Sequence, residues 1–470
     1  MSKPVFLNSI PDLFEHINIH EHKHISFHHH LRNGDDVINR VLSIYEAYNV
    51  KDIHLHPSAI FPSYHRILSL IKRGQITDIT TSYINGDVGE YISEYGLKGN
   101  LLMTSHGTRA RGIIEGKESI NIAYLAVPTV DQNGNGTGTI GPSRCGSLGY
   151  AVADSEHADI VVLITDNIVD ETLINPQIDG RHVDYVITVE SIGDPKGIVS
   201  GITQLTTNPI GVKIAHTAAT ILTSLSSMKS GFSYQSGAGG ISLKVTDYLR
   251  QYMETSNIKA QFFSGGITAY HVNMLTEGLV EELYDVQCFD LRAVESISQY
   301  EHHHAISASK YANPQDDTRV IKALDFVILG ATEIDVNFNC NVTTDSFNTI
   351  IGGSGGHHDV AEEANVTIVV SPLIKGRIPI VKDRVTTITT PGQHIDIFVT
   401  ERGVAINPNR EDLINELSQT NINLLPIDTL KNIAENYTGK PKEIGQSHEP
   451  IGYILDRDYN RIDTLYKKKG

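Results

Sequence analysis

ISFHHHLRNGDDVINRVL, at residues 25–42, returns in altered form as FSYQSGAGGISLKVTDYL at residues 232–249. Both stretches begin with a hydrophobic residue, a serine and an aromatic residue, which is typical of the end of a buried strand. A short loop follows, and then a helical pattern that in the first copy places Val37, Val41, Leu42 and Tyr45 on one face. The first loop carries three histidines and an arginine, whereas the second carries glycines. The two copies therefore offer different chemistry at the same place in the fold.

Two further pairs of segments repeat at nearly the same distance along the chain. VDQNGNGTG (130–138) resembles IDVNFNCNV (334–342), and ADIVVLIT (158–165) resembles ANVTIVVS (364–371). The three offsets are 207, 204 and 206 residues, and the order of the segments is kept. This self-similarity predicts a duplicated α/β domain. We expect one domain at residues 1–228, a second at 229–445 and a C-terminal tail at 446–470.

Short runs rich in valine and isoleucine alternate with helical patterns along the chain. We expect strands within 52–60, 120–128, 158–166 and 184–191, helices within 35–50 and from Pro209, a β-rich segment at 376–403, and a helical segment at 410–436 that is interrupted around Leu425 and Pro426. Strands that alternate with helices predict a mostly parallel sheet with flanking helices. We expect the polar segment 456–470 to pack weakly or to serve a partner.

Charge and composition exclude several classes of partner. Lys plus Arg is 38 and Asp plus Glu is 55, which gives a net charge of −17. Nucleic acids and anionic membranes reward clustered positive charge, so neither is an expected partner. No apolar run reaches the ~18 residues of a membrane span, and the first residues lack the pattern of a secretory signal. Cys145, Cys288 and Cys340 are far apart, as expected for incidental buried thiols in a reducing cytosol. We expect a soluble, cytoplasmic protein.

Histidine clusters raise the question of a bound metal. They stand at His28–His30, His302–His304 and His357–His358. Adjacent side chains on a strand point to opposite faces and cannot easily chelate one ion. Histidines that are packed, solvated or placed to bind an anion are the alternatives, and we expect no metal site.

A possible calcium loop begins at Asp131-x-Asn133-x-Asn135-Gly136. Pro142 stands where such a loop needs a bidentate glutamate. We therefore expect the Asp and Asn side chains to bond turn backbone instead.

Two glycine-rich loops and one strand end are candidates for anion binding through backbone N–H groups. SGAGGIS (236–242) opens a helix, GGSGGHHD (352–359) follows a β-rich segment, and Ser264-Gly265-Gly266 ends a strand. Consecutive N–H groups in such loops can point at an anion or oxyanion, although an ordinary turn explains each one singly. Neither loop matches the Walker or Rossmann pattern, so ATP and NAD are not the expected ligands.

Several long motifs resemble those of the CoA-transferase and acetyl-CoA hydrolase superfamily. They are YQSGAGGISLKV (234–245), EIDVNFNCNVTTDSFNTIIGGSGGHHD (333–359), VTERGVA (399–405), SHGTRARGI (105–113) and VPTVDQNGNGTG (127–138). More narrowly, four others resemble the alpha subunits of citrate lyase: ISFHHHLRNGD (25–35), INGDVGEYI (84–92), GPSRCGSLGYAVADSEHADIVVLITDNIV (141–169) and FFSGGITAYHVNMLTEGLVEELYDVQCFD (262–290). The resemblance covers residues 20–410 and implies two CoA-transferase-like (NagB/RpiA-like) α/β domains.

The resemblance implies a citrate:acetyl-acyl-carrier-protein transferase, in which citrate replaces acetate on a carrier thioester. It implies two partners, the acyl carrier (gamma) subunit and the citryl lyase (beta) subunit of citrate lyase, in a complex where this chain forms a homo-oligomer. It also implies that this chain holds no cofactor tightly. The thiol belongs to a CoA-derived phosphopantetheine group on the carrier, for which acetyl-CoA can stand in.

One departure from the superfamily pattern concerns the reaction path. Many of its CoA-transferases carry a glutamate at the position that aligns with Gly265, and this glutamate forms a covalent thioester. Glycine has no carboxylate to acylate. The resemblance therefore implies that the carboxylate of citrate attacks the acetyl thioester itself and forms a bound mixed anhydride.

Candidate site residues follow from this hypothesis. The candidate catalytic residues are Gly237, Gly239, Gly240, Gly352, Gly353, Gly355 and Gly356, whose N–H groups would stabilise oxyanions, and Glu333, which is either a general base or a structural hydrogen-bond acceptor. The candidate substrate-binding residues are His28, His29, His30, Arg32, Arg109, Arg111, Arg144, Ser264, Gly265, Gly266, His357 and His358. Arg32 with His28–His30 is the first choice as a source of positive charge for citrate, since an arginine fork suits carboxylates.

Two other functions stay open. One is a sibling enzyme, either an acetyl-CoA hydrolase or another carboxylate CoA-transferase. The other is a non-catalytic scaffold that docks the carrier and lyase subunits.

Overall fold

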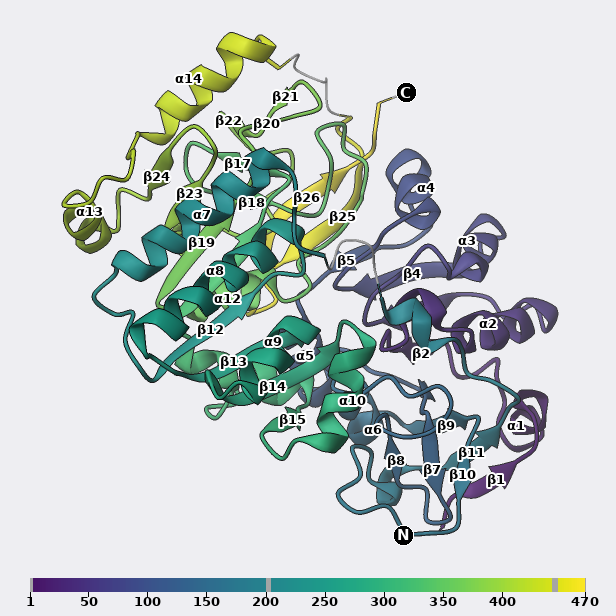
Figure 1. Ribbon diagram of the computed structural model, residues 1–470. Coiled ribbons are helices and arrows are strands. Elements are labelled where there is room, and N and C mark those ends of the chain that lie inside the picture. The colour runs from purple at the N-terminus through teal and green to yellow at the C-terminus, as the bar shows by residue number, and fades with distance from the viewer. Residues whose placement is uncertain (1–2, 200–203, 442–446, 470) are drawn as a thin grey trace.

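Two large sheets organise the chain into two α/β halves (Figure 1). The computed structural model describes residues 3–199, 204–441 and 447–469. Central strands of both sheets are almost wholly buried runs of apolar residues, such as IVVLIT at 160–165 and VTIVV at 366–370. This is the pattern of parallel strands that helices cover on both faces. The predicted α/β fold with mostly parallel sheets is confirmed.

The first sheet has ten strands in the order β1-β11-β9-β6-β2-β3-β4-β5-β25-β26. Their bounds are β1 (Val5–Leu7), β2 (His24–Phe27), β3 (Ile53–Pro57), β4 (Ile76–Thr81), β5 (Leu101–Met103), β6 (Ile122–Ala126), β9 (Ile160–Thr165), β11 (Tyr185–Thr188), β25 (Pro450–Leu455) and β26 (Arg461–Tyr466). All neighbours are parallel except β25 and β26, which form an antiparallel hairpin. The four strands expected in the first half are β3, β6, β9 and β11.

The second sheet has eight strands in the order β15-β14-β13-β12-β16-β19-β23-β24. Their bounds are β12 (Phe232–Ser236), β13 (Ala260–Ile267), β14 (Val280–Cys288), β15 (His303–Ala305), β16 (Phe326–Gly330), β19 (Val366–Val370), β23 (Ile397–Val399) and β24 (Val404–Ile406). The run β23-β19-β16-β12-β13-β14-β15 repeats the run β11-β9-β6-β2-β3-β4-β5 of the first sheet. The two halves therefore share one topology, as the repeated segments predict.

Helices pack on both sheets (Figure 1). Those up to residue 224 are α1 (Ile10–His16), α2 (Val37–Ala47), α3 (His65–Lys72), α4 (Asp87–Tyr95), α5 (His106–Ile114), α6 (Val152–His157) and α7 (Pro209–Ser224). Those that follow are α8 (Gly240–Ser256), α9 (Ala269–Thr276), α10 (Leu291–Gln299), α11 (Ala308–Ala312), α12 (His357–Glu363), α13 (Glu411–Leu417) and α14 (Ile427–Thr438). The expected interruption around Leu425 and Pro426 is the gap between α13 and α14. Short 3-10 helices are η1 (Arg32–Gly34), η2 (Gly180–His182), η3 (Pro195–Ile198), η4 (Val320–Ala323) and η5 (Gly392–His394).

Helix α7 bears on the domain boundary. It packs against α8, β19 and β23 of the second half. The boundary at residues 228 and 229 stays a prediction, and this packing favours a boundary before α7. An amphipathic helix does not reveal in its sequence which of two similar sheets it will cover.

Three small sheets flank the large ones. They are β10-β7-β8, with β7 (Thr129–Asp131), β8 (Gly136–Thr137) and β10 (Ile168–Val169); β18-β17-β22, with β17 (Glu333–Asp335), β18 (Cys340–Asn341) and β22 (Val381–Lys382); and the pair β20 (Ile374–Lys375) and β21 (Ile378–Pro379). The Asp131 carboxylate accepts hydrogen bonds from the N–H groups of Asn133 at 2.8 Å and Asn135 at 3.0 Å. Asp335 caps the turn of the second copy in the same way. The predicted role of these side chains in turn structure is confirmed.

The C-terminal segment is part of the first half. Strand β25 pairs with β5, so the yellow hairpin in Figure 1 extends the first sheet. Arg457, in the turn of the hairpin, is 2% exposed and forms ion pairs with Asp359, Glu362 and Glu363. Of the two alternatives that we expected for this segment, weak packing is wrong, and service to a partner stays a prediction. Arg457 pairs with carboxylates of α12. The composition of the segment alone does not predict such pairs.

Two further expectations concern burial and membranes. Cys145, Cys288 and Cys340 are all buried, as expected. Within the described ranges, no helix has both the length and the apolar character needed to cross a membrane.

Candidate functional site

Loops from the two halves meet where the parallel strands end. The N–H of His106, after β5, donates to the Gly355 carbonyl at 2.8 Å, and the N–H of Gly355 donates to the Ser82 carbonyl, after β4, at 3.1 Å. Gln287, in β14, donates to the carbonyl of His29, after β2, at 2.9 Å. Ligands of α/β proteins bind beyond the carboxyl ends of the strands. The junction of the two halves is therefore the candidate site.

The three histidines 28–30 lie inside this junction. His29 contacts the Ser58 hydroxyl through Nδ1 at 2.6 Å and the Gln287 amide oxygen through Nε2 at 3.1 Å. His30 Nε2 accepts a hydrogen bond from the N–H of Tyr150 at 3.2 Å. Both ring nitrogens of His28 and Nδ1 of His30 have no hydrogen-bond partner among the described residues.

These histidines are neutral. Burial lowers the pKa of His28 to about 4 and lowers the pKa of His29 and of His30 well below the ordinary value. This departs from our expectation that they contribute positive charge, because desolvation disfavours the charged imidazole in this state of the protein. They remain available as neutral donors and acceptors of hydrogen bonds.

Arg32 supplies the charge that the histidines lack. Its φ angle of 52° is left-handed, which is uncommon for a residue with a side chain. The side chain is buried between two aromatic rings, with the guanidinium carbon 5.4 Å from the Phe61 centroid and 4.9 Å from the Phe289 centroid. Its Nε and Nη1 atoms have no hydrogen-bond partner in the part of the chain that the structure describes. A buried guanidinium without an anion is prepared to bind one.

The segment Ser264-Gly265-Gly266 lies against Phe289 and Gln235. A Cβ atom on Gly266 would lie 2.1 Å from the ring of Phe289, the residue that stacks on Arg32. A Cβ atom on Gly265, which has φ +94°, would lie 2.7 Å from the side-chain amide of Gln235. The oxygen of that amide also accepts a hydrogen bond from the Ser264 hydroxyl at 3.0 Å. A carboxylate side chain at position 265 would need the space that Gln235 occupies.

The loop at residues 352–356 joins the two halves. The N–H of Gly352 donates to the Thr343 carbonyl, and the N–H of Gly355 donates to Ser82. These two N–H groups are therefore not available to an oxyanion in this state, which departs from our expectation. The glycines allow close approach instead, since a Cβ on Gly353 would lie 2.2 Å from the Ser82 carbonyl oxygen. Gly356 lies against Tyr311, whose hydroxyl oxygen would be 2.9 Å from a Cβ there.

The loop at residues 237–240 connects β12 with α8. The N–H of Gly237 donates to the Ile328 carbonyl at 2.8 Å, so it too is engaged. Gly239 is the N-cap of α8 and Gly240 is its first residue. The first N–H groups of a helix have no acceptor inside the helix. The N–H groups of Gly239 and Gly240 have no acceptor among the described residues and so stay candidate donors to an anion, whereas that of Gly237 is engaged.

The other arginines of the candidate set are already paired. Arg109 holds the buried carboxylate of Asp154 through both terminal nitrogens, at 2.7 and 2.8 Å. Arg111 binds Glu115 and Asp458. The Arg144 side chain is 48% exposed and lies 3.6 Å from Glu295. Each of these three guanidinium groups therefore has a carboxylate partner, unlike that of Arg32 among the described residues.

Glu333 is a structural acceptor. Its donors are Lys382, the Ser346 hydroxyl at 2.6 Å, the Asn341 amide at 3.0 Å and the N–H of Thr386 at 2.7 Å. Burial alone would raise the pKa of Glu333, but the charge of Lys382 and the hydrogen bonds from Lys382, Ser346 and Asn341 together outweigh burial, and the pKa lies below the ordinary value. Of the two roles left open by the sequence, the contacts favour the structural one.

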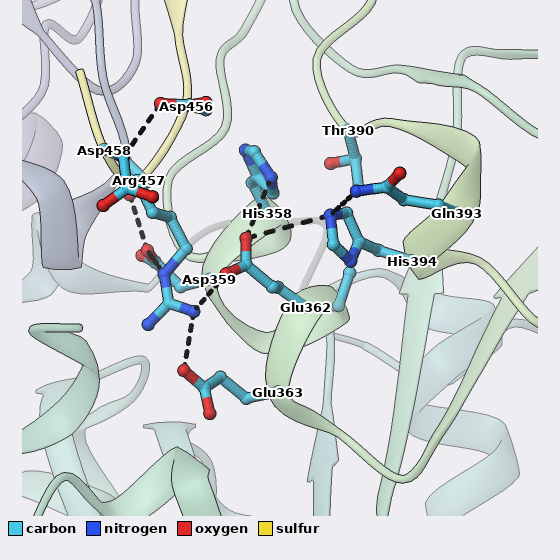
Figure 2. A network of polar contacts seen from close by, with 12 residues as sticks. His358, Asp359, Glu362, Glu363, Thr390, Gln393, His394, Asp456, Arg457 and Asp458 are labelled. Atoms are coloured by element: carbon cyan, nitrogen blue, oxygen red, sulfur yellow. Dashed lines mark hydrogen bonds and ion pairs between the residues drawn. The ribbon is translucent and has the colours of Figure 1, made fainter. Parts of the chain in front are cut away.

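His357 and His358 begin helix α12. His357 bonds the Thr390 hydroxyl at 2.8 Å and the Gly330 carbonyl at 3.0 Å, so both its ring nitrogens are engaged. Figure 2 shows His358 turned toward Glu362, at 3.4 Å, with His394 on the other side of that carboxylate at 3.8 Å. This trio and a second one, His24, His54 and His56, are the groups of described residues whose ligand atoms lie close enough together to hold a metal ion.

Several residues of the junction were not singled out in the sequence, among them His106, Gln287 and Phe289. His106 contacts Ser82 through Nδ1 at 3.0 Å, and its ring lies 4.3 Å from that of Tyr150. Gln287, in β14, contacts His29, and Phe289, directly after β14, stacks on Arg32. His106 stands in the SHGTRARGI motif and the other two in the motif at 262–290, so the motifs marked the segments but not the side chains.

The fold is the one seen in solved CoA-transferases. A solved 4-hydroxybutyrate CoA-transferase from Porphyromonas gingivalis has this fold, with a TM-score of 0.56 at 14% identity over 92% of this chain and 97% of its own. The family model described as "Citrate lyase, alpha subunit (CitF)" matches residues 5–468. The chain belongs to the family of citrate lyase alpha subunits, and it is an enzyme of the CoA-transferase class.

Individual relatives agree with this assignment. The citrate lyase alpha chain of Haemophilus influenzae is 43% identical over 95% of this chain and 89% of its own length, and that of Klebsiella pneumoniae is 40% identical over 95% and 88%. A crystal structure of the alpha subunit of citrate lyase from Streptococcus mutans, in complex with citrate, has a TM-score of 0.97 and 42% identity. The match covers 100% of this chain and 92% of the chain in that crystal structure.

Proposed function

We propose that this chain binds citrate and transfers it onto a thioester in exchange for acetate, as a subunit of a citrate lyase complex. The observation that carries the proposal is the buried guanidinium of Arg32, which lacks an anionic partner among the described residues. Leaving such a charge unpaired costs several kcal/mol, and a carboxylate ligand removes that cost. The citrate complex of the Streptococcus mutans relative supports citrate as this anion.

The reaction that we propose needs no acyl group on the protein. A carboxylate oxygen of citrate adds to the acetyl carbonyl carbon and the carbon–sulfur bond breaks. The thiolate departs, and a citryl–acetyl mixed anhydride is formed. The thiolate then adds to the citryl carbonyl carbon, the carbon–oxygen bond of the anhydride breaks, and acetate leaves. No proton is gained or lost overall. Both steps pass through an oxyanion, and each preorganised donor is worth about 3 kcal/mol to such a species.

Other groups of the chain fit these needs. His28 and His30 have ring nitrogens without partners, and neutral imidazoles can donate to an oxyanion. The N–H groups at the start of α8, at Gly239 and Gly240, are further candidate donors. Gly265 offers no carboxylate, and Gln235 fills the space beside it. These features support direct attack by citrate.

The thiol is supplied from outside the chain. We propose that it is a CoA-type phosphopantetheine on the acyl carrier (gamma) subunit, that a citryl lyase (beta) subunit consumes the product, and that no cofactor is held tightly by this chain. Belonging to a citrate lyase alpha family supports partners of this kind. Homo-oligomer formation and a cytoplasmic location stay predictions.

The experiment is an acyl-acceptor assay on the isolated full chain with acetyl-CoA. Transfer to citrate should exceed transfer to acetate or water. After incubation with acetyl-CoA alone, mass spectrometry should detect no glutamyl-CoA adduct, and borohydride should trap none. Water as the best acceptor would instead show a hydrolase, and no transfer at all would show a scaffold. An adduct on any glutamate would overturn the direct path.

A further inference from the structure

A cluster of three histidines lies on the first sheet, and no step above uses it. His24 is the first residue of β2, and His54 and His56 lie in β3. Residues i and i+2 of a strand share a face, so the His-x-His pair places two imidazoles side by side. His24 is the register partner of His54 on the neighbouring parallel strand. The backbone therefore brings all three rings to one face.

The distances are those of ligands around one ion. His24 Nδ1 lies 3.2 Å from His56 Nε2. One ring nitrogen from each of the three residues lies within 4.8 Å of the others. Zinc–nitrogen bonds of about 2.0–2.1 Å place two tetrahedral ligand atoms roughly 3.4 Å apart. Small shifts of the side chains suffice to close the cluster around a metal.

Neighbouring side chains orient two of the rings. His56 Nδ1 faces a carboxylate oxygen of Glu118 at 3.4 Å, and His54 Nε2 faces the Thr80 hydroxyl at 3.0 Å. Glu118 is in turn held by the hydroxyl of Tyr459 at 2.8 Å. Metal-bound histidines usually carry such a partner on the second nitrogen, which fixes the tautomer.

The cluster is open to solvent on one side. His56 is buried, whereas His24 and His54 are half-buried. Three imidazoles leave the fourth position of a tetrahedral ion free for water. An ion can therefore enter from solvent without unfolding the sheet.

We propose that His24, His54 and His56 bind one divalent transition-metal ion of the zinc type. This departs from our expectation of no metal site. That expectation considered runs of adjacent histidines, whereas these ligands come from a His-x-His pair and the next strand. The trio in Figure 2 is less suited to a cation, because the Arg457 guanidinium lies 3.2 Å from the Glu362 carboxylate.

The test is metal binding by the full chain after chelator treatment and dialysis. Co²⁺ should give one equivalent per chain with the visible absorption of a tetrahedral nitrogen site, and Zn²⁺ should displace it and raise the Tm. In E118Q, which loses only the partner of His56 Nδ1, the affinity for the metal should fall roughly 10–100-fold. It should fall further in H24Q and H56Q, which each lose a ligand. H20Q and H394Q should bind as the wild type does.

H56Q alters a buried residue and can fail to fold, so the decisive variant is H24Q. Its altered ring is half-buried, and its fold can be checked by circular dichroism and by citrate transfer. Unchanged affinity in H24Q would overturn the proposal, as would loss of binding in H394Q alone or no binding by the wild type.

Discussion

The side chain of Gln287 fixes which nitrogen of His29 carries the proton. The Gln287 amide nitrogen donates to the His29 carbonyl at 2.9 Å, so its oxygen accepts from His29 Nε2 at 3.1 Å. Because burial keeps the ring neutral, Nδ1 is unprotonated and accepts from the Ser58 hydroxyl at 2.6 Å. One imidazole of fixed orientation therefore joins the two halves beside Arg32.

Replacing Gln287 with leucine should destabilise this junction. Q287L leaves the ring N–H and the carbonyl of His29 without partners, and the free energy of unfolding should fall by about 1–3 kcal/mol per unsatisfied group. Urea unfolding measures the change. Q299L removes an exposed amide that bonds Arg292 and should change stability by no more than about 0.5 kcal/mol. Equal effects of the two variants would show that the His29 contact contributes little.

Substitution of Arg32 should separate stability from activity. R32M removes a buried charge that has no partner, so the free energy of unfolding should rise by about 1–4 kcal/mol. Citrate transfer should fall at least about 100-fold in kcat/KM, because the anion loses its bidentate donor. R32K keeps the charge but not the fork, and it should recover only part of the activity. A variant that is less stable yet fully active would contradict this role.

Stability should fall in acid through His28. Burial lowers the pKa of the folded side chain from 6.5 to about 4. Between these values the unfolded chain binds a proton at this residue and the folded chain does not, so stability is lost as the pH falls. The contribution is about 3 kcal/mol over the whole window. Urea unfolding measures the free energy of unfolding near pH 7 and near pH 4.5. The decrease between the two pH values should be about 2 kcal/mol smaller in H28Q than in the wild type. Identical differences would mean that His28 does not titrate in this way.

Removing Arg457 should release the C-terminal hairpin. R457M leaves Asp359, Glu362 and Glu363 without their common cation, and a loss of about 3–5 kcal/mol is expected for a broken buried pair. Limited proteolysis should then cut near residue 457. The matched variant R181M removes a guanidinium whose side chain is 74% exposed and that pairs with Asp179. It should behave as the wild type, and similar losses in both variants would contradict the account.

Features that rest on local pattern could be predicted from the sequence. Valine- and isoleucine-rich runs gave the strands, and three ordered repeats gave the shared topology of the halves. The placement of Arg32 at the junction could also be predicted, because an arginine beside the first loop copy stands where parallel strands end, whereas its role in binding citrate stays a proposal. Each of these depends on neighbours in the sequence or on strand order alone.

Long-range pairing set the limits of prediction. The engagement of Gly352 and Gly355 depends on Thr343 and on Ser82 of the other half. The burial of Arg457 depends on carboxylates of α12, about a hundred residues earlier. The low pKa of His28 follows from desolvation by the assembled junction. Residue type and spacing carry no information on such partners.

The central claim is that the carboxylate of citrate attacks the acetyl thioester itself. Oxygen transfer in a single turnover tests this claim most directly. Enzyme in excess over acetyl-CoA is mixed with citrate labelled with ¹⁸O in its carboxylates, and the acetate released is analysed by mass spectrometry. Direct attack places one citrate oxygen in the first acetate formed, so that acetate should carry ¹⁸O. A protein carboxylate acting as the acyl acceptor would donate its own oxygen first. Unlabelled acetate in the first turnover would therefore contradict the account.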